Sequence, residues 1–271
     1  MPDFWTRLNG DAEGVHRHLM TSRLKQGNGG SSVRVAFSVN HWAAWAPGLT
    51  SPEAWRAWAQ APAVAPRGSE TPPLTEVPAM ARRRVERLGR PAFQVAQWCQ
   101  GDARDFPLVF ASRHGDPGRS AGLLTSLAKG EPLSPTSFAL SVHNAIGAQY
   151  SIIRGDTANV SAISNGLFTP EAAVVEAVAL LGDGHPEVMM VVYDASAPAI
   201  FAAHYDEPLA DFAFAWRLTK GGGFSLENTA APATASVDLP HALSVFRFFL
   251  GPERSYMRGD GAAGWTWSRH D

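Results

Sequence analysis

Short runs of hydrophobic residues along the chain predict the strands of a sheet. Residues 33–39 and 157–164 alternate apolar and polar side chains, as a strand with one buried face does. Residues 106–112 and 187–195 are almost continuously apolar, which is typical of strands that are buried on both faces. Residues 208–220 predict one more strand. We therefore expect a sheet with both half-buried and fully buried strands.

Between these strands, apolar residues recur every three or four positions, which predicts helices. Ser51 and Thr169 each precede a proline, and we expect them to be N-caps with the proline at the first helical position. Pro91 predicts a kink or a break within the second helical segment. Strands that alternate with helices indicate an α/β fold. The predicted helices cover residues 51–60, 81–99, 119–130, 169–182 and 238–251.

The composition divides the chain into an N-terminal extension and one larger domain. Residues 25–32 (KQGNGGSS) have the composition of a flexible linker, so we expect residues 1–32 to be a flexible extension. Residues 33–271 are expected to form the domain. The glycine run at residues 221–224 (GGGF) is predicted to be a loop, because the strand–glycine–helix frame of a phosphate cradle does not surround it.

Charge and cysteine content limit the partners and cofactors. The formal net charge of −2 gives no general attraction to nucleic acid or to anionic membranes. The one cysteine, Cys99, excludes an internal disulfide and a zinc site built from several cysteines. We expect no metal and no cofactor. No apolar run has the length of a membrane-spanning helix or the form of a secretory signal, so we expect a soluble, cytoplasmic protein.

One strand–helix junction has the pattern of a nucleophile turn. Residues 162–166 (AISNG) are a relaxed version of the G-x-S-x-G elbow, with Ser164 at the position of the nucleophile. A serine at a helix N-terminus lies near free backbone N–H groups that can stabilise an oxyanion. Asp194, followed by His204 or His241, would complete a triad in the order Ser, Asp, His. A serine esterase or thioesterase is therefore one hypothesis.

Other polar residues have simpler explanations. His143, beside Asn144 in an apolar run, is more typical of a hydrogen-bonded core residue than of a general base. Residues 113–116 (RHGD) could contact a phosphate or a metal, but a solvated turn explains them better. Residues 82–87 (RRRVER) form a solvated helix face or a docking surface for an acidic partner.

A longer part of the chain resembles a known family. Residues 109–152, with the block SPTSF and then SVHN, precede a strand, a turn of small residues and residues 166–181 (GLFTPEAAVVEAVALL). This order resembles the N-terminal half of a β-ketoacyl synthase of the thiolase superfamily. It is most similar to the chain length factor group of aryl polyene and xanthomonadin-type pigment pathways. The resemblance extends over about residues 34–200 and implies a thiolase-like fold in α/β/α layers.

The resemblance also implies that the chain lacks condensing chemistry. In that family a catalytic cysteine lies at the strand–helix turn, where this chain has Ser164 and Asn165, and Cys99 lies too far upstream to replace it. The blocks that supply two histidines and a lysine are absent, and the chain is too short for a second thiolase half. The implied function is a non-catalytic subunit, a chain length factor, that pairs with an active β-ketoacyl-ACP synthase in polyene or fatty-acid-type biosynthesis.

The resemblance further implies where the partner binds. In thiolase-like proteins the strand before the nucleophile turn pairs with its counterpart across a two-fold dimer. Residues 157–164 would be that strand, and Phe138 would approach the acyl tunnel of the partner and limit product length. An acyl carrier protein is a further candidate partner, and a self-associating acyl-binding protein is a second alternative function. The implied interface and tunnel residues are Phe138, Leu140, His143, Asn144, Thr157, Asn159, Val160 and Ser161.

Overall fold

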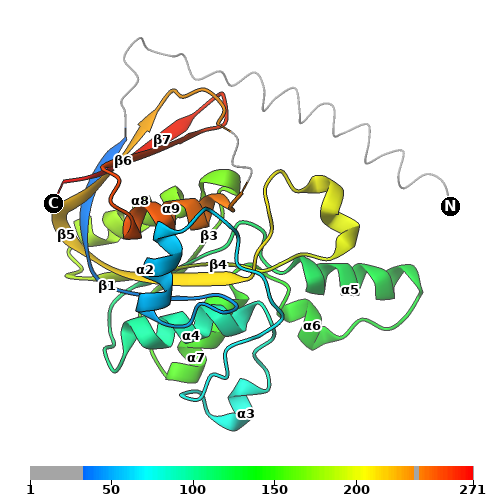
Figure 1. Cartoon of the computed structure of the whole chain (residues 1–271). Helices are drawn as coiled ribbons and strands as arrows, with labels where there is room; N and C mark the ends of the chain where they lie inside the picture. The colour runs from blue at the N-terminus through cyan, green and yellow to red at the C-terminus, as the bar shows by residue number, and fades with distance from the viewer. Residues whose placement is uncertain (1–32, 235–237, 271) are drawn as a thin grey trace, which may run out of the picture. The chain divides into compact units, whose positions relative to one another are not determined.

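The computed structural model describes residues 33–234 and 238–270, so the predicted extension at residues 1–32 lies outside the described residues. A seven-stranded mixed sheet forms the centre of the described chain (Figure 1). Its strands follow the order β3-β2-β4-β5-β7-β6, and β1 pairs with β5. The strands are β1 (Arg34–Trp45), β2 (Leu108–Ala111), β3 (Val160–Ile163), β4 (Val188–Asp194), β5 (Phe212–Thr229), β6 (Ser255–Gly259) and β7 (Gly264–Arg269).

Helices cover both faces of the sheet. Helices α2, α8 and α9 pack on one face, and α4 and α7 pack on the other (Figure 1). This arrangement confirms the predicted α/β/α layers. Within the described ranges, no helix combines the length and the apolar character that crossing a bilayer requires. The helices are α2 (Pro52–Gln60), α3 (Ala79–Arg82), α4 (Gly89–Gln100), α5 (Pro117–Ala128), α6 (Pro135–Ala139), α7 (Ala145–Arg154), α8 (Thr169–Gly182) and α9 (His241–Leu250), with short 3₁₀ segments η1 (Gly166–Phe168) and η2 (Ala199–His204).

The parallel part of the sheet positions the candidate site. Strand β2 runs parallel to β3 and to β4 and lies between them, whereas β5 pairs antiparallel with β1, β4 and β7. The chain passes from β3 through α8 to β4, which is the predicted strand–helix–strand unit. Because parallel strands end at the same edge of a sheet, the residues that follow β2, β3 and β4 gather there.

The two faces of the central strands explain why these strands could be predicted. In β2, Val109 packs towards α8 and α9, whereas Leu108 and Phe110 pack towards α4 and α7. In β4, Met190 packs towards α8 and α9, whereas Met189 packs towards α4 and α7. All five side chains are buried. A strand that is buried on both faces must be apolar throughout, and this is the pattern found in the sequence.

Two helix predictions are wrong in detail. The helix expected over residues 81–99 is divided into α3 and α4, and Pro91 does not cause the break. Pro91 lies in the first turn of α4, where its missing N–H removes no helical hydrogen bond. Thr169 is not an N-cap but the first residue of α8, with helical φ and ψ angles of −58° and −42°.

The second half of β5 and the C-terminal hairpin were not predicted. Strand β5 continues through residues 221–224, which were expected to form a loop. Strand β1 pairs Ser38 with Thr219 but Phe37 with Phe224, so the residues between them bulge out of the ladder. A glycine-rich bulge has the local composition of a loop. The β6–β7 hairpin then pairs with the continuation of β5 and extends the sheet.

Candidate functional site

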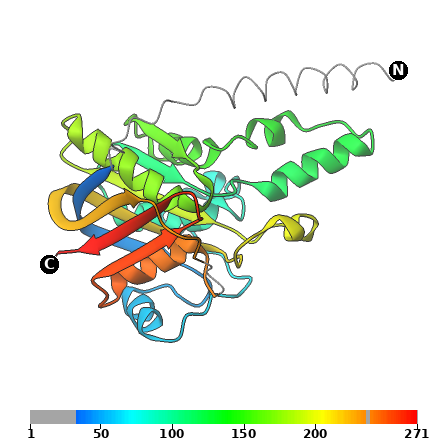
Figure 2. The ribbon, with the colours of Figure 1, turned by 90° about the horizontal axis from the view of Figure 1, so that it is seen from above.

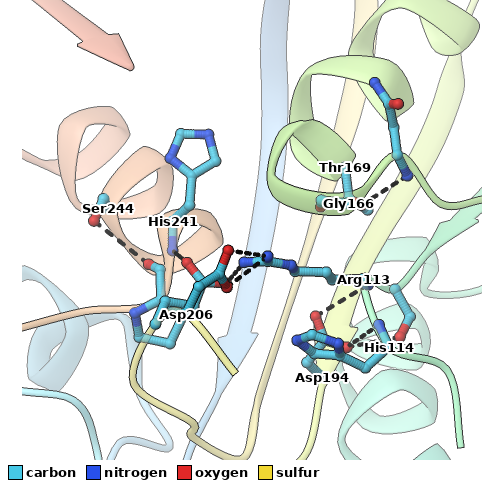
Figure 3. A network of polar contacts seen from close by, with 12 residues as sticks. Arg113, His114, Gly166, Thr169, Asp194, Asp206, His241 and Ser244 are labelled. Atoms are coloured by element: carbon cyan, nitrogen blue, oxygen red, sulfur yellow. Dashed lines mark hydrogen bonds and ion pairs between the residues drawn. The ribbon is translucent and has the colours of Figure 1, made fainter. Parts of the chain in front are cut away.

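The candidate site lies at the edge where the parallel strands end, beside the start of α8 (Figure 3). Ser112 and Arg113 follow β2, Ser164 follows β3, and Asp194 is the last residue of β4. The strand order β3-β2-β4 brings these distant parts of the sequence to one edge. Ser164 and Asp194 therefore lie at the end of the sheet that the predicted strands indicated.

Hydrogen bonds within the turn between β3 and α8 hold its shape. The Asn165 amide donates to the Thr169 hydroxyl (2.9 Å), which donates to the carbonyl of Gly166 (2.8 Å). Gly166 has a φ angle of +53°, in the left-handed region that favours glycine. Ser164 is exposed, and its hydroxyl donates to the carbonyl of Arg113 (3.2 Å). A main-chain carbonyl cannot act as the general base that a serine nucleophile needs.

Asp194 orders the loop after β2. Its carboxylate accepts hydrogen bonds from the Ser112 hydroxyl (2.7 Å) and from the backbone N–H groups of Arg113 and His114 (3.2 Å each). Removal from water raises the pKa of Asp194, and these hydrogen bonds act against that rise. The Ser112 hydroxyl also accepts from the Gly115 amide (2.8 Å). The role that these contacts give to Asp194 is structural, because they hold the loop after β2 in place.

Ion pairs occupy the space beside Asp194. The Arg113 guanidinium pairs with the carboxylates of Asp206 (2.7 Å) and Glu207 (2.5 Å) (Figure 3). Burial lowers the pKa of Arg113, but the two carboxylates outweigh burial and raise the pKa above its ordinary value. The cavity that Arg113, Asp194 and Glu207 line has a volume of about 20 Å³. That volume holds about one water molecule, so the cavity is too small for an acyl substrate.

A buried carboxylate that the sequence analysis missed lies at the start of α8. Glu171 is fully buried (0% exposed), and its Oε1 is hydrogen-bonded to Nε2 of His241 (2.7 Å) and to Nε1 of Trp267 (2.8 Å). Nδ1 of His241 lies 3.1 Å from the hydroxyl of Tyr256. The partners of Glu171 are 70 and 96 residues away in the sequence. The only local signal was a glutamate in the first turn of an apolar helix.

The residues of the hypothetical esterase triad have other partners. Ser164 donates to a carbonyl, Asp194 binds the loop after β2, and His241 is engaged with Glu171. His204 lies in the exposed end of η2. A general base must lie within about 2.6–3.2 Å of the group that it deprotonates. The geometry therefore gives the serine esterase hypothesis no support.

Cys99 does not supply a reactive thiol either. It is buried in α4, and its Sγ lies 3.8 Å from the carbonyl oxygen of His41. Burial raises the pKa of Cys99 to about 12. The thiolate fraction at neutral pH is then on the order of 10⁻⁵, and the thiolate is the nucleophilic form.

The polar residues before α7 contribute to the framework of the site. Nε2 of His143 lies 2.9 Å from the carbonyl oxygen of Ser112, which ties the segment between α6 and α7 to the loop after β2. Asn144 is exposed at the start of α7, and its side chain forms no capping hydrogen bond.

Among the residues that the structure describes, no group of three His, Cys, Asp or Glu side chains could hold a metal ion.

Strand β3 forms an edge of the sheet. Within the described strands it pairs only with β2. The carbonyls of Asn159 and Ile163 accept hydrogen bonds from the N–H groups of Leu108 (2.9 Å) and Ser112 (3.2 Å). Because backbone groups alternate in direction along a strand, the N–H and C=O groups of Val160 and Ala162 point away from β2. The strand begins at Val160, three residues later than predicted, and Thr157 and Asn159 are exposed before it.

An apolar surface lies on residues 117–139, which we call the α5–α6 arm. Helices α5 and α6 extend away from the sheet (Figures 1 and 2). Helix α5 corresponds to the helix predicted over residues 119–130, and it buries none of its residues. Leu124, Leu127 and Phe138 are 60%, 61% and 66% exposed. Large apolar side chains gathered on one projecting segment are typical of a protein–protein contact surface.

Comparison with known proteins identifies the family, although no curated protein matches the chain. A chain of the ketosynthase (ApeO) in complex with its chain length factor (ApeC) from Xenorhabdus doucetiae is 29% identical, with a TM-score of 0.79, and the match covers 87% of this chain and 100% of that chain. The ishigamide ketosynthase/chain length factor is 13% identical, with a TM-score of 0.57, and the match covers 72% of this chain and 68% of that chain. A β-ketoacyl synthase from Burkholderia phymatum shares the fold at 13% identity and a TM-score of 0.54, over 73% of this chain and 65% of that chain. Because residues 55–268 match the family model of the β-ketoacyl synthase N-terminal domain, the chain belongs to this family, as its resemblance to ketoacyl synthases predicted.

Proposed function

We propose that this chain is a non-catalytic ketosynthase-like subunit, which pairs with an active β-ketoacyl-ACP synthase and acts as its chain length factor. The observation that carries the proposal is the turn at Ser164 and Asn165. It lies between strand and helix, where a condensing enzyme of this fold carries its cysteine. Here the Ser164 hydroxyl is bonded to a carbonyl and the Asn165 amide to Thr169.

Carbon–carbon bond formation by a ketosynthase needs a thiolate that takes the acyl chain and donors that stabilise the enolate. The only cysteine of the chain is Cys99, whose pKa burial raises to about 12. The cavity beside Arg113 is too small for an acyl chain, at about 20 Å³. A chain that keeps the ketosynthase fold but has no room for an acyl chain at its own candidate site is suited to shaping the active site of a partner.

The similar chain from Xenorhabdus doucetiae supports a subunit that acts in a pair. That chain comes from a ketosynthase in complex with its chain length factor, and the match covers 100% of it. No part of that chain therefore lies outside the match. The sequence resemblance to the chain length factor group supports a pathway of the aryl polyene type, and we propose that the chain acts there in the cytoplasm, with acyl groups supplied on a carrier protein.

Strand β3 is the proposed centre of the interface. Its outer edge presents the backbone N–H and C=O groups of Val160 and Ala162, and an open edge tends to be covered by another strand. Thr157, Asn159 and Ser161 lie in or just before the same strand and would contact the partner beside it. A two-fold contact pairs β3 with the equivalent strand of the ketosynthase.

The α5–α6 arm would place bulk at the partner's acyl tunnel. Phe138 is 66% exposed at the end of α6, and Leu140 follows it. His143 and Asn144 lie in the short connection to α7, where His143 fixes the position of this segment through Ser112. Limiting the length of a chain needs only shape, so an apolar side chain such as Phe138 suits this role without acid, base or nucleophile.

Co-expression with the ketosynthase of an aryl polyene pathway tests the pairing. We expect a tag on this chain to retain the untagged ketosynthase in equal amounts, with the mass of a heterodimer in solution. The same ketosynthase expressed with an unrelated tagged protein is the control. If this chain instead forms a dimer with itself and leaves the ketosynthase unbound, the self-associating alternative replaces the chain length factor.

A further inference from the structure

A second cavity lies between α9 and β6, outside the candidate site. Its volume is about 390 Å³, which is within the range of small-molecule pockets. Helix α9 and strand β6 pack against each other and form two of its walls, and the loop after α2 contributes Ala63. Its walls include Ser244, Phe248, Tyr256, Met257 and Arg258.

Arg258 is the unusual member of this wall. Its side chain lies on β6 and is only 7% exposed, and its Nε has no hydrogen-bond partner among the described residues. Two other arginines of the described chain have carboxylate partners: Arg119 pairs with Glu86 (2.7 Å) and Arg217 with Glu187 (2.6 Å). No such ion pair is found for Arg258 within the described ranges. A poorly exposed guanidinium without a counter-ion is unfavourable, so an anion held in the cavity beside it would stabilise this arrangement.

The other charged groups of the cavity do not neutralise Arg258. Arg247 directs its guanidinium to the carbonyls of Ala59 (3.0 Å) and Ala61 (2.7 Å). Asp238 and Glu253 also line the cavity, but both are exposed to water. Exposed carboxylates are screened by solvent and compensate a buried cation poorly. The cavity thus has a cationic inner wall and a hydrated rim.

We propose that this cavity binds the carboxylate or phosphate group of a small organic anion, with Arg258 as the counter-ion. The hydroxyls of Tyr256 and Ser244, which lie 3.1 Å from Nδ1 of His241 and 3.4 Å from the carbonyl oxygen of Pro240, are the neutral polar groups of the same wall. Burial raises the pKa of Tyr256 to about 12, so the phenol keeps its proton at neutral pH. The apolar side chains of Phe248 and Met257 would contact the body of the ligand, since the cavity is much larger than one anionic group.

Calorimetric titration with inorganic phosphate and with hexanoate, at constant ionic strength, tests the proposal. We expect at least one of these anions to bind saturably, and Arg258→Met to weaken that binding at least 10-fold while the aliphatic packing is kept. Arg83→Met is the control, because it removes the same charge from an exposed position. Binding of phosphate alone indicates a phosphate-bearing ligand, and tighter binding of hexanoate indicates a carboxylic acid with an apolar body.

A second pair of variants keeps the test decisive if Arg258→Met does not fold. Ala63→Trp fills the cavity from the loop after α2 and should abolish binding, whereas Val64→Trp places the same side chain at an exposed neighbour. The proposal is overturned if neither anion binds the unaltered protein. It is also overturned if binding persists unchanged in the folded Arg258→Met protein or, failing that, in Ala63→Trp.

Discussion

Ser164 shows at the scale of a single residue how the chain differs from a condensing enzyme. Its hydroxyl is exposed at the start of a helix, which is a favourable place for a nucleophile, but it donates to the carbonyl of Arg113 (3.2 Å). Nearby Asp194 is occupied by Ser112 and by backbone amides, so it does not orient a histidine. The hydrogen bonds of Ser164 and Asp194 therefore hold the turn and the loop beside it, and they do not activate a nucleophile.

We expect a fluorophosphonate probe to leave the folded protein unlabelled, because the Ser164 hydroxyl donates to a carbonyl and no general base among the described residues is hydrogen-bonded to it. Intact-mass spectrometry after incubation with the probe measures this directly, with a known serine esterase as the positive control. Stoichiometric labelling that disappears in Ser164→Ala would restore the hydrolase hypothesis and contradict the proposed function.

Glu171 is a residue on which stability should depend. Glu171→Ala leaves Nε1 of Trp267 and a ring nitrogen of His241 buried without their partner, so we expect a loss of roughly 3 kcal/mol in the free energy of unfolding. Urea denaturation gives the value. Glu176→Ala is the matched control on the same helix: it removes a half-buried carboxylate that accepts from Ser161 (3.0 Å), and about 1 kcal/mol or less is expected. Equal losses for the two variants would refute this assignment.

At the scale of elements, the alternating direction of the backbone N–H groups along β3 makes it possible to disturb partner binding without disturbing the fold. The N–H groups of Val160 and Ala162 point away from β2, whereas that of Ser161 points towards it. Proline is tolerated in an edge strand where the N–H faces outward, and it breaks the ladder where the N–H faces a neighbour. The same substitution at adjacent positions should therefore have different consequences.

Ala162→Pro is expected to leave the thermal unfolding temperature of the isolated chain nearly unchanged and to abolish pairing with the ketosynthase. Ser161→Pro should lower the unfolding temperature, because it removes a hydrogen bond to β2. Differential scanning fluorimetry and co-purification measure the two effects. A folded Ala162→Pro protein that still binds the ketosynthase with unchanged affinity would show that β3 is not the interface.

The α5–α6 arm makes a separate prediction about product length. Phe138→Ala removes a large exposed side chain, so the complex should form normally while its products shift to longer chains. Mass spectrometry of the released products gives the distribution, and Ile152→Ala, at another exposed apolar position (76% exposed), should leave it unchanged. An intact complex with the same products in both variants would exclude Phe138 from the tunnel.

For the molecule as a whole, the buried central strands were predictable from the sequence, whereas the C-terminal extension of the sheet was not. Strands β2 and β4 are buried on both faces, so their apolar runs identify them locally. The glycines of β5 bulge opposite Ser38, and the β6–β7 hairpin depends on pairing with β5, so neither has a clear local signal. The same reason explains why Glu171 was missed, since both of its partners lie in the C-terminal part of the chain.

The absence of a cysteine at Ser164 was visible in the sequence, but its consequence required the fold. Only the structure places Arg113 and its two carboxylate partners beside the turn and reduces the cavity there to about 20 Å³. The family assignment and the closed site together lead to a subunit that shapes chemistry performed by its partner.

The central claim is tested most directly by product analysis of a reconstituted condensation reaction. The ketosynthase, this chain, or both are incubated with acyl and malonyl carrier proteins, and the β-ketoacyl products are measured by mass spectrometry. We predict products of defined length only when both subunits are present, with no change when this chain carries Cys99→Ala. Condensation by this chain alone, or an identical product distribution from the ketosynthase alone, would contradict the account.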